Sequence, residues 1–242
     1  MRARKSVYVL LAVGVWLLLF GAAKLEAADL EAGNIKKMEK EAVQQEDIYF
    51  EKKSQTFING ELAGPEKVMS VWLKGDRIRF ESEDNKNQYT LILMDKGKTY
   101  ELDKSQKTYR EVSSEMDKLK EASERTTVVV SKRTGEKKKI KDWNCYQVLV
   151  ETTLEGNKMK ATCWLSEDIH VSPKAIEKMA KFSKMKMLEE LAKYPGYPVE
   201  VTMDSTLQGK QVRVVSTLTK IVKGPIKAEF VQIPFEYTKI GL

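Results

Sequence analysis

Apolar and polar residues alternate along most of the chain after Ile48, which is typical of strands that bury one face. Turn sequences such as Asn59-Gly60 and Lys74-Gly75-Asp76 separate the alternating runs. The pattern predicts strands near 49–58, 68–73, 77–81, 89–94, 99–102, 108–112, 126–132, 140–153, 158–165, 199–207 and 211–222, with one turn at 134–136. Consecutive strands joined by short turns predict an antiparallel meander.

Two segments interrupt this alternation with the spacing of helices. Apolar side chains recur every three residues within 113–125, which predicts a short amphipathic helix. A longer helix is expected over 173–194, because Ser172 is a good N-cap and Pro173 suits the first helical position. The Pro195-Gly196-Tyr197-Pro198 sequence then stops it.

Together these elements predict a mainly β fold of the α+β class. We expect an antiparallel sheet of about ten strands that is partly wrapped around helices. Residues 46–242 are expected to form a single domain, preceded at 28–45 by a polar arm or short helix.

The first 27 residues have the order of a secretory signal peptide. Residues 2–5 carry three basic side chains, an apolar run follows over 7–23, and Leu25-Glu26-Ala27 provides a small-residue cleavage site. We therefore expect a periplasmic protein that begins at Ala28. The alternative is an uncleaved N-terminal helix that anchors the protein in the membrane.

The net charge depends on this cleavage. The whole chain carries 42 basic and 35 acidic side chains, a net charge of +7. Without residues 1–27, which hold four basic and one acidic side chain, the counts are 38 and 34 and the net charge is +4. Lysine and glutamate alternate throughout, so we expect no nucleic-acid partner. The one dense run, Lys137-Lys138-Lys139, is read as a solvated hairpin tip, with a peripheral membrane contact as the alternative.

No catalytic or metal-binding pattern is present in the sequence. Ser166, Asp168 and His170 have triad chemistry, but neighbours at this spacing do not form a triad and no nucleophile elbow accompanies them. The cysteines and the single histidine lack the spacing of a metal site, and no glycine-rich phosphate loop opens a helix. We therefore expect a protein that is not an enzyme and uses no metal or cofactor.

Cys145 and Cys163 lie on consecutive predicted strands and suggest a disulfide in an oxidising compartment. A two-residue turn at Glu155-Gly156 would place Cys145 opposite Ser166, three residues from Cys163, which exceeds the reach of a disulfide. A bulge would be needed to form the bridge. We nevertheless predict the bridge, and two separate buried thiols are the alternative.

The expected long helix has one apolar stripe and an outlying pair. Ile176, Met179, Met187 and Leu191, with Ala180, share one side, and the methionines make this side adaptable to variable ligands. The stripe is a candidate ligand-binding surface, with ordinary core packing as the alternative. Phe182 and Met185 lie on the opposite side and are a candidate partner patch.

Several stretches resemble a known family when they are taken in order. These are 72–79 with its Lys-Gly-Asp-Arg core, 102–109, 145–148, 163–166 and the closing 230–237. The chain resembles an uncharacterised family of secreted bacterial proteins, a domain of unknown function, that is related to the LolA/LolB-like periplasmic lipoprotein carriers. One difference is Pro234-Phe235-Glu236-Tyr237, where that family usually has glycine soon after proline.

The resemblance implies a curved, half-open antiparallel sheet whose concave apolar face is covered by helices. In the carriers this face receives acyl chains. Two hypotheses follow: an exported envelope protein that binds an acyl chain, a lipid or a lipidated peptide, or a periplasmic interaction module whose core is filled by its own side chains. The sequence specifies neither the ligand nor the oligomeric state.

Overall fold

The computed structural model describes residues 47–112, 117, 121, 125–154, 157–171 and 186–241. The strands are β1 (Ile48–Ile58), β2 (Glu61–Leu62), β3 (Lys67–Lys74), β4 (Arg77–Ser82), β5 (Gln88–Leu93), β6 (Lys98–Asp103), β7 (Thr108–Glu111), β8 (Thr126–Ile140), β9 (Trp143–Leu154), β10 (Asn157–Ser166), β11 (Tyr197–Leu207), β12 (Lys210–Lys223) and β13 (Thr238–Lys239). One α-helix, α5 (Lys186–Leu191), and three 3₁₀ turns, η1 (Glu83–Asn85), η2 (Met94–Lys96) and η3 (Ala228–Val231), are also described. None of the described helices is long and apolar enough to span a membrane.

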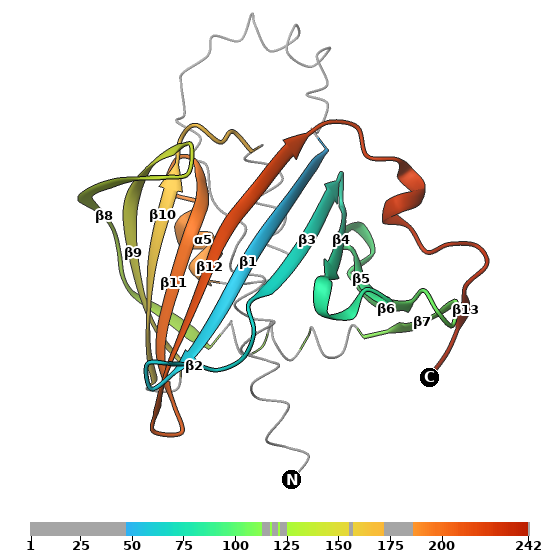
Figure 1. The fold of residues 1–242 in the computed structure, drawn as a ribbon, viewed down its shortest axis with the longest axis horizontal. Coiled ribbons are helices and arrows are strands. Elements are labelled where there is room, and N and C mark those ends of the chain that lie inside the picture. Colours follow the sequence, from blue (N-terminus) through green and yellow to red (C-terminus); the bar gives the residue numbers. More distant parts are fainter. Residues whose placement is uncertain are drawn as a thin grey trace, which may run out of the picture.

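All the described strands belong to one curved, open sheet (Figure 1). Its order is β13-β7-β6-β5-β4-β3-β1-β12-β11-β10-β9-β8, with β2 paired to β1. Every pair is antiparallel except β13 with β7, so the predicted mainly β, antiparallel architecture is confirmed. The expected number of about ten strands was too low. The structure adds β2 and β13, which have two residues each and are too short to show alternation.

The turn predicted at 134–136 is wrong, because these residues lie inside β8. The pairing of β8 with β9 shifts between Arg133 and Lys137, so a bulge absorbs the extra residues. The chain reverses later, where Lys141 has a φ of 53°. The lysine run 137–139 is therefore exposed strand and not a hairpin tip.

One face of the sheet, which we call the inner face, carries α5. Met187 and Leu191 of this helix pack with the apolar side chains of β9, β10 and β11, and Leu188 packs with those of β1, β3 and β12. Of the helix expected at 113–125, the structure describes only residues 117, 121 and 125. The first part of the helix expected at 173–194 lies outside the described residues. Of the long helix, the structure thus describes only α5, which packs on the inner face.

The opposite, outer face is covered over β3 to β7 by the C-terminal segment, residues 226–237 (Figure 1). Val231 is buried in a cluster with Tyr89, Leu91, Leu93, Tyr100 and Leu102, and Ile226, Ile233 and Tyr237 pack against it. The carboxylate of Asp47 fixes the start of this segment, because it accepts hydrogen bonds from Lys74 Nζ at 2.6 Å and from the Ile226 amide at 2.8 Å. The C-terminal segment therefore buries the apolar side chains on the outer face of this half of the sheet.

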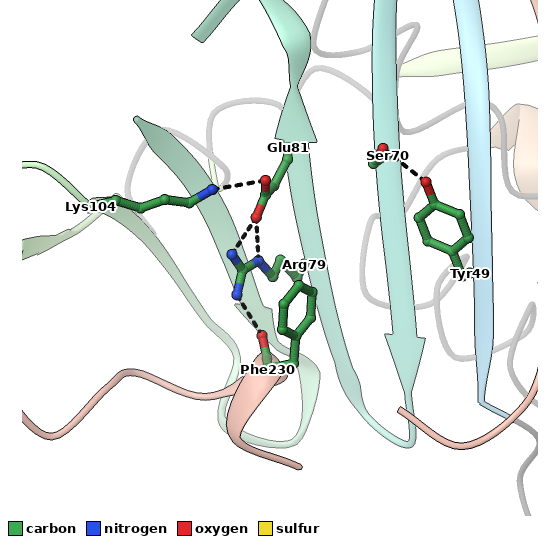
Figure 2. Close-up of polar contacts among 6 residues, drawn as sticks. All are labelled: Tyr49, Ser70, Arg79, Glu81, Lys104 and Phe230. Carbon is green, nitrogen blue, oxygen red and sulfur yellow. Dashed lines mark hydrogen bonds and ion pairs between the residues drawn. The ribbon is translucent and has the colours of Figure 1, made fainter. Parts of the chain in front are cut away.

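Arg79 fastens the C-terminal segment to the outer face (Figure 2). Its guanidinium donates to the carbonyl of Phe230 at 2.9 Å and to the carboxylate of Glu81, which Lys104 also contacts at 2.9 Å. The guanidinium carbon lies 3.8 Å from the centroid of the Tyr89 ring and 4.0 Å from that of Phe230. One buried cation thus joins β4, β5 and η3 by ion pairing, hydrogen bonding and stacking.

We predict that Arg79→Met lowers the free energy of unfolding by about 3 kcal/mol, because the substitution leaves the Glu81 carboxylate and the Phe230 carbonyl short of a donor in a poorly hydrated site. Urea unfolding followed by circular dichroism measures this loss. Arg110→Met is the matched control: Arg110 pairs with Glu101 at the exposed surface, and its loss should cost less than about 1 kcal/mol. Equal losses for the two variants would contradict the role of Arg79.

Candidate functional site

The inner face is built of rows of side chains that face one another across β1, β12, β11, β10 and β9. We call the row nearest the hairpin turns the mouth row: Ile58, Val212, Ser205, Met159 and Thr152. The middle row is Thr56, Val214, Met203, Ala161 and Val150, and the deep row is Ser54, Ser216, Val201, Cys163 and Val148. Because side chains alternate along each strand, successive rows are about 6.6 Å apart. The rows form a largely apolar wall.

A pocket of about 830 Å³ lies at the mouth row. Its lining combines apolar side chains (Phe57, Val129, Met159, Val212, Val215) with charged ones (Glu151, Lys158, Lys160, Asp204, Arg213). The charged residues, and also Phe57 and Val215, have the strand parity opposite to that of the mouth row, so most of the lining comes from the outer face. The pocket therefore lies mainly on the charged outer face beside the mouth row, and its volume falls within the range of ligand sites.

Two hydroxyls on the inner face are buried without a hydrogen-bond partner in the part of the chain that the structure describes. Thr152, in the mouth row, is 1% exposed, and Ser216, in the deep row, is 2% exposed. A buried hydroxyl without a partner costs about 1–3 kcal/mol. Such groups are uncommon in a packed core and are well placed to receive a polar atom of a ligand.

Lys52 continues this line beyond the deep row. It follows Ser54 at an interval of two residues on β1, lies opposite Leu218, and is 3% exposed. Its ammonium is 5.3 Å from the Phe50 ring centroid and 5.0 Å from that of Tyr197. Burial lowers the pKa of Lys52 well below its ordinary value. Sequence reasoning missed this residue, although its parity with Ile48 and Phe50 places it on the buried face.

Only part of the predicted ligand stripe can be located. Ile176, Met179 and the proposed partner patch, Phe182 and Met185, lie outside the described residues. Met187 is 4% exposed and Leu191 is fully buried, and both contact the inner face over β9 to β11. The structure therefore places these two residues against the apolar wall, where protein side chains bury them.

The triad residues do not form a nucleophilic site in the structure. Ser166 is fully buried, and its hydroxyl accepts a hydrogen bond from the Asp168 amide at 3.2 Å. The Asp168 carboxylate instead accepts from the Asn144 amide at 3.0 Å, which lowers its pKa, and His170 is exposed. Across the described ranges, no group of three histidine, cysteine or acidic side chains could hold a metal ion.

The predicted disulfide between Cys145 and Cys163 is wrong: both are buried free thiols. Leu154 pairs with Asn157, and the register of β9 with β10 places Cys145 opposite Ser166 and Cys163 opposite Val148. The pairing continues from Asn157 to Ser166 without the bulge that a bridge requires. Burial raises the pKa of Cys145 to about 11 and that of Cys163 to about 12.

A family profile described as a domain of unknown function, DUF4412, matches residues 58–237. No curated protein sequence matches the chain. Several solved structures resemble it, and three of them illustrate the range. PNGF-II is 12% identical with a TM-score of 0.38, and the match covers 80% of this chain and 30% of PNGF-II.

The MucA/MucB complex of Pseudomonas aeruginosa is 13% identical with a TM-score of 0.41, and the match covers 81% of this chain and 58% of that one. A putative outer membrane lipoprotein-sorting protein domain from Vibrio parahaemolyticus is 9% identical with a TM-score of 0.32, covering 81% and 93%. The chain thus spans about a third of PNGF-II. Resemblances of this size do not assign a function.

We predict that Thr152→Val raises the free energy of unfolding by about 1 kcal/mol in the ligand-free protein, because it removes a buried hydroxyl that makes no hydrogen bond. Thr134→Val is the control, since the Thr134 hydroxyl donates to Gln147 at 3.1 Å and its loss should be destabilising. Thermal unfolding compares the two. A destabilised Thr152→Val variant would show that this hydroxyl has a partner in the folded protein.

We also predict that neither cysteine reacts with a thiol reagent at pH 8 until the protein unfolds, after which both react. The native thiols keep their protons because their pKa values are raised, whereas an unfolded cysteine ionises near pH 8.5. By linkage, the free energy of unfolding should decline as the pH rises above about 9. Absence of two titratable thiols in the denatured, unreduced protein would contradict the free-thiol structure.

Proposed function

The chain belongs to the DUF4412 family, as the resemblance to an uncharacterised family predicted, and we propose that it is an exported envelope protein that binds the apolar part of an amphipathic ligand without catalysis. The ligand lies in the pocket beside the mouth row, against its apolar side chains. An acyl chain, a lipid or a lipidated peptide has the required chemistry.

One observation carries this proposal: a pocket of about 830 Å³ beside the mouth row combines apolar side chains, among them Phe57, Val129 and Val215, with charged ones. An acyl chain against these apolar side chains gains about 0.8 kcal/mol for each buried methylene group. The charged side chains at the rim face water or the polar end of a ligand. The partly exposed state of Ile58 and Met159, in contrast to the buried deep row, keeps this end accessible.

The absence of catalysis is supported by the geometry around the candidate nucleophiles. The Ser166 hydroxyl is enclosed, and the raised pKa values of both cysteines keep the thiols protonated and weakly nucleophilic. Export is supported by the signal-peptide order of residues 1–27. A periplasmic location gives such a protein access to lipids and lipidated proteins of the envelope.

The second candidate function is a periplasmic interaction module with a self-filled core. Met187 and Leu191 favour it, because both are buried among β9–β11 side chains as in an ordinary core. The two candidates differ in a measurable way. A carrier binds apolar probes with a saturable isotherm, whereas a self-filled module binds none.

The test is titration of the mature protein, residues 28–242, with a fluorescent fatty acid. We predict saturable binding, and we predict that Met159→Trp weakens it at least tenfold by filling the mouth while leaving the fold intact. Val222→Trp, at an exposed position of β12 away from the pocket, is the matched control and should bind as the unmodified protein does. A mature protein that folds but binds no apolar probe would refute the carrier function and leave the interaction module.

A further inference from the structure

Strand β10 carries two lysines at the pocket that form no ion pair with another described residue. Lys158 and Lys160 both line the pocket, and they share the outer face because they are two residues apart on one strand, about 6.6 Å along it. Lysines elsewhere on the sheet do pair, as Lys138 does with Glu200 at 2.8 Å. Two like charges at a concave surface attract an anion, because each raises the positive potential there.

The charges around these lysines leave a positive surplus. In the sheet register, Lys160 lies between Glu151 on β9 and Asp204 on β11. Asp204 is already held by Arg213, whose guanidinium donates to its two carboxylate oxygens at 2.6 Å and 3.2 Å. Of the described lining, Glu151 is therefore the one acidic side chain left to face both lysines. Three cations and two anions line the described pocket, so its net charge is positive.

A hydroxyl lies beside the lysine pair. Met159 of β10 faces Ser205 of β11, so the next positions on the outer face, Lys158 and Thr206, are neighbours across the two strands. Both of them line the pocket. Two ammonium groups and one hydroxyl are thus available as hydrogen-bond donors in one part of the pocket.

We propose that Lys158 and Lys160, with the Thr206 hydroxyl, bind the phosphate of the ligand's head group. This inference rests on the proposed function and narrows its ligand to a phosphate-bearing, single-chain lipid. A phosphate presents several acceptor oxygens, so it accepts hydrogen bonds from both ammonium groups at once. Its negative charge also offsets the positive surplus of the pocket.

The apolar part of the pocket lies within reach of the acyl chain of the same molecule. Val215 and Phe57 line the pocket from β12 and β1, which are two and three strands from β10 in the sheet order. Neighbouring strands are about 4.8 Å apart, so about 10–14 Å separates these side chains from the lysine pair. The phosphate thus lies over β10, and the acyl chain crosses the strands toward β1.

The experiment compares lysophosphatidylglycerol with a monoacylglycerol of the same acyl chain, by calorimetric titration of the mature protein. We expect the phospholipid to bind about tenfold more tightly at low ionic strength, and this preference to shrink in high salt because the lysines are exposed. The double variant Lys158→Met, Lys160→Met should lose the preference and keep its affinity for the monoacylglycerol. Glu151→Gln should strengthen phospholipid binding severalfold, because it removes a negative charge beside the phosphate.

A second lysine pair provides the matched control. Lys137 and Lys139 are exposed on β8 at the same spacing of two residues and do not line the pocket. The double variant Lys137→Met, Lys139→Met should therefore keep the full preference for the phospholipid. A loss of the preference in this control would show that the net charge of the protein, and not the pocket, attracts the phosphate, and would overturn the proposal.

The other outcomes separate this proposal from the proposed function. If neither lipid binds, the proposed function fails and the phosphate site fails with it. If both lipids bind equally, or if the Lys158→Met, Lys160→Met variant retains the preference, the carrier function stands and the phosphate site is refuted. Inorganic phosphate that binds alone as tightly as the phospholipid would show a site for free phosphate and overturn the assignment to a lipid head group.

Discussion

A sheet of this width exposes two large faces to water, and the need to cover them organises the whole molecule. The outer face of β3–β7 is apolar, and α5, which packs on the inner face, leaves it uncovered. The C-terminal segment closes the outer side, and Arg79 is the polar link that holds it there. The β9–β12 half is different, because its outer face carries charged side chains such as Arg213 and Asp204, which pair at 2.6 Å. The apolar character of that half is concentrated on the inner face, whereas the candidate pocket lies mainly among the charged side chains of the outer face.

Much of the fold could be predicted because strand alternation is a local property. Asn59-Gly60 and Lys74-Gly75 gave correct turns, since both contain residues with positive φ. Gly135 led to a wrong prediction: a glycine between polar residues is typical of a turn, yet here it lies in the bulged strand β8. Only the bulge, a tertiary feature, distinguishes a turn from a continuing strand at this position. The two cysteines show the opposite case, in which the local sequence was the better guide. The short turn between the predicted strands already indicated that Cys145 and Cys163 are not opposite each other, yet a disulfide was predicted.

The candidate site was less accessible to sequence reasoning. An apolar stripe on a helix can be recognised from the spacing of its residues, so the sequence predicted Met187 and Leu191 as candidate site residues. The wall opposite them is assembled from five strands separated by up to about 150 residues, and its rows exist only once the register is known. The buried position of Lys52 was missed for a simpler reason, because Glu51, Lys52 and Lys53 form a continuous charged stretch that is typical of exposed residues. Extending the parity of Ile48 and Phe50 by one step would have placed Lys52 inside.

The bulges and lysines of β8 have a consequence for how the protein behaves at high concentration. An open sheet has two edges, and an unpaired edge strand is a template for a strand from another molecule. Here one edge is β13, with two residues, and the other is β8, whose register breaks twice and whose exposed end carries Lys137, Lys138 and Lys139. The register breaks and the like charges of these lysines hinder pairing with β8 of a second molecule, because such pairing needs a regular and uncharged strand edge. The sheet can therefore remain open along its sides without inviting the edge-to-edge stacking that leads to fibres.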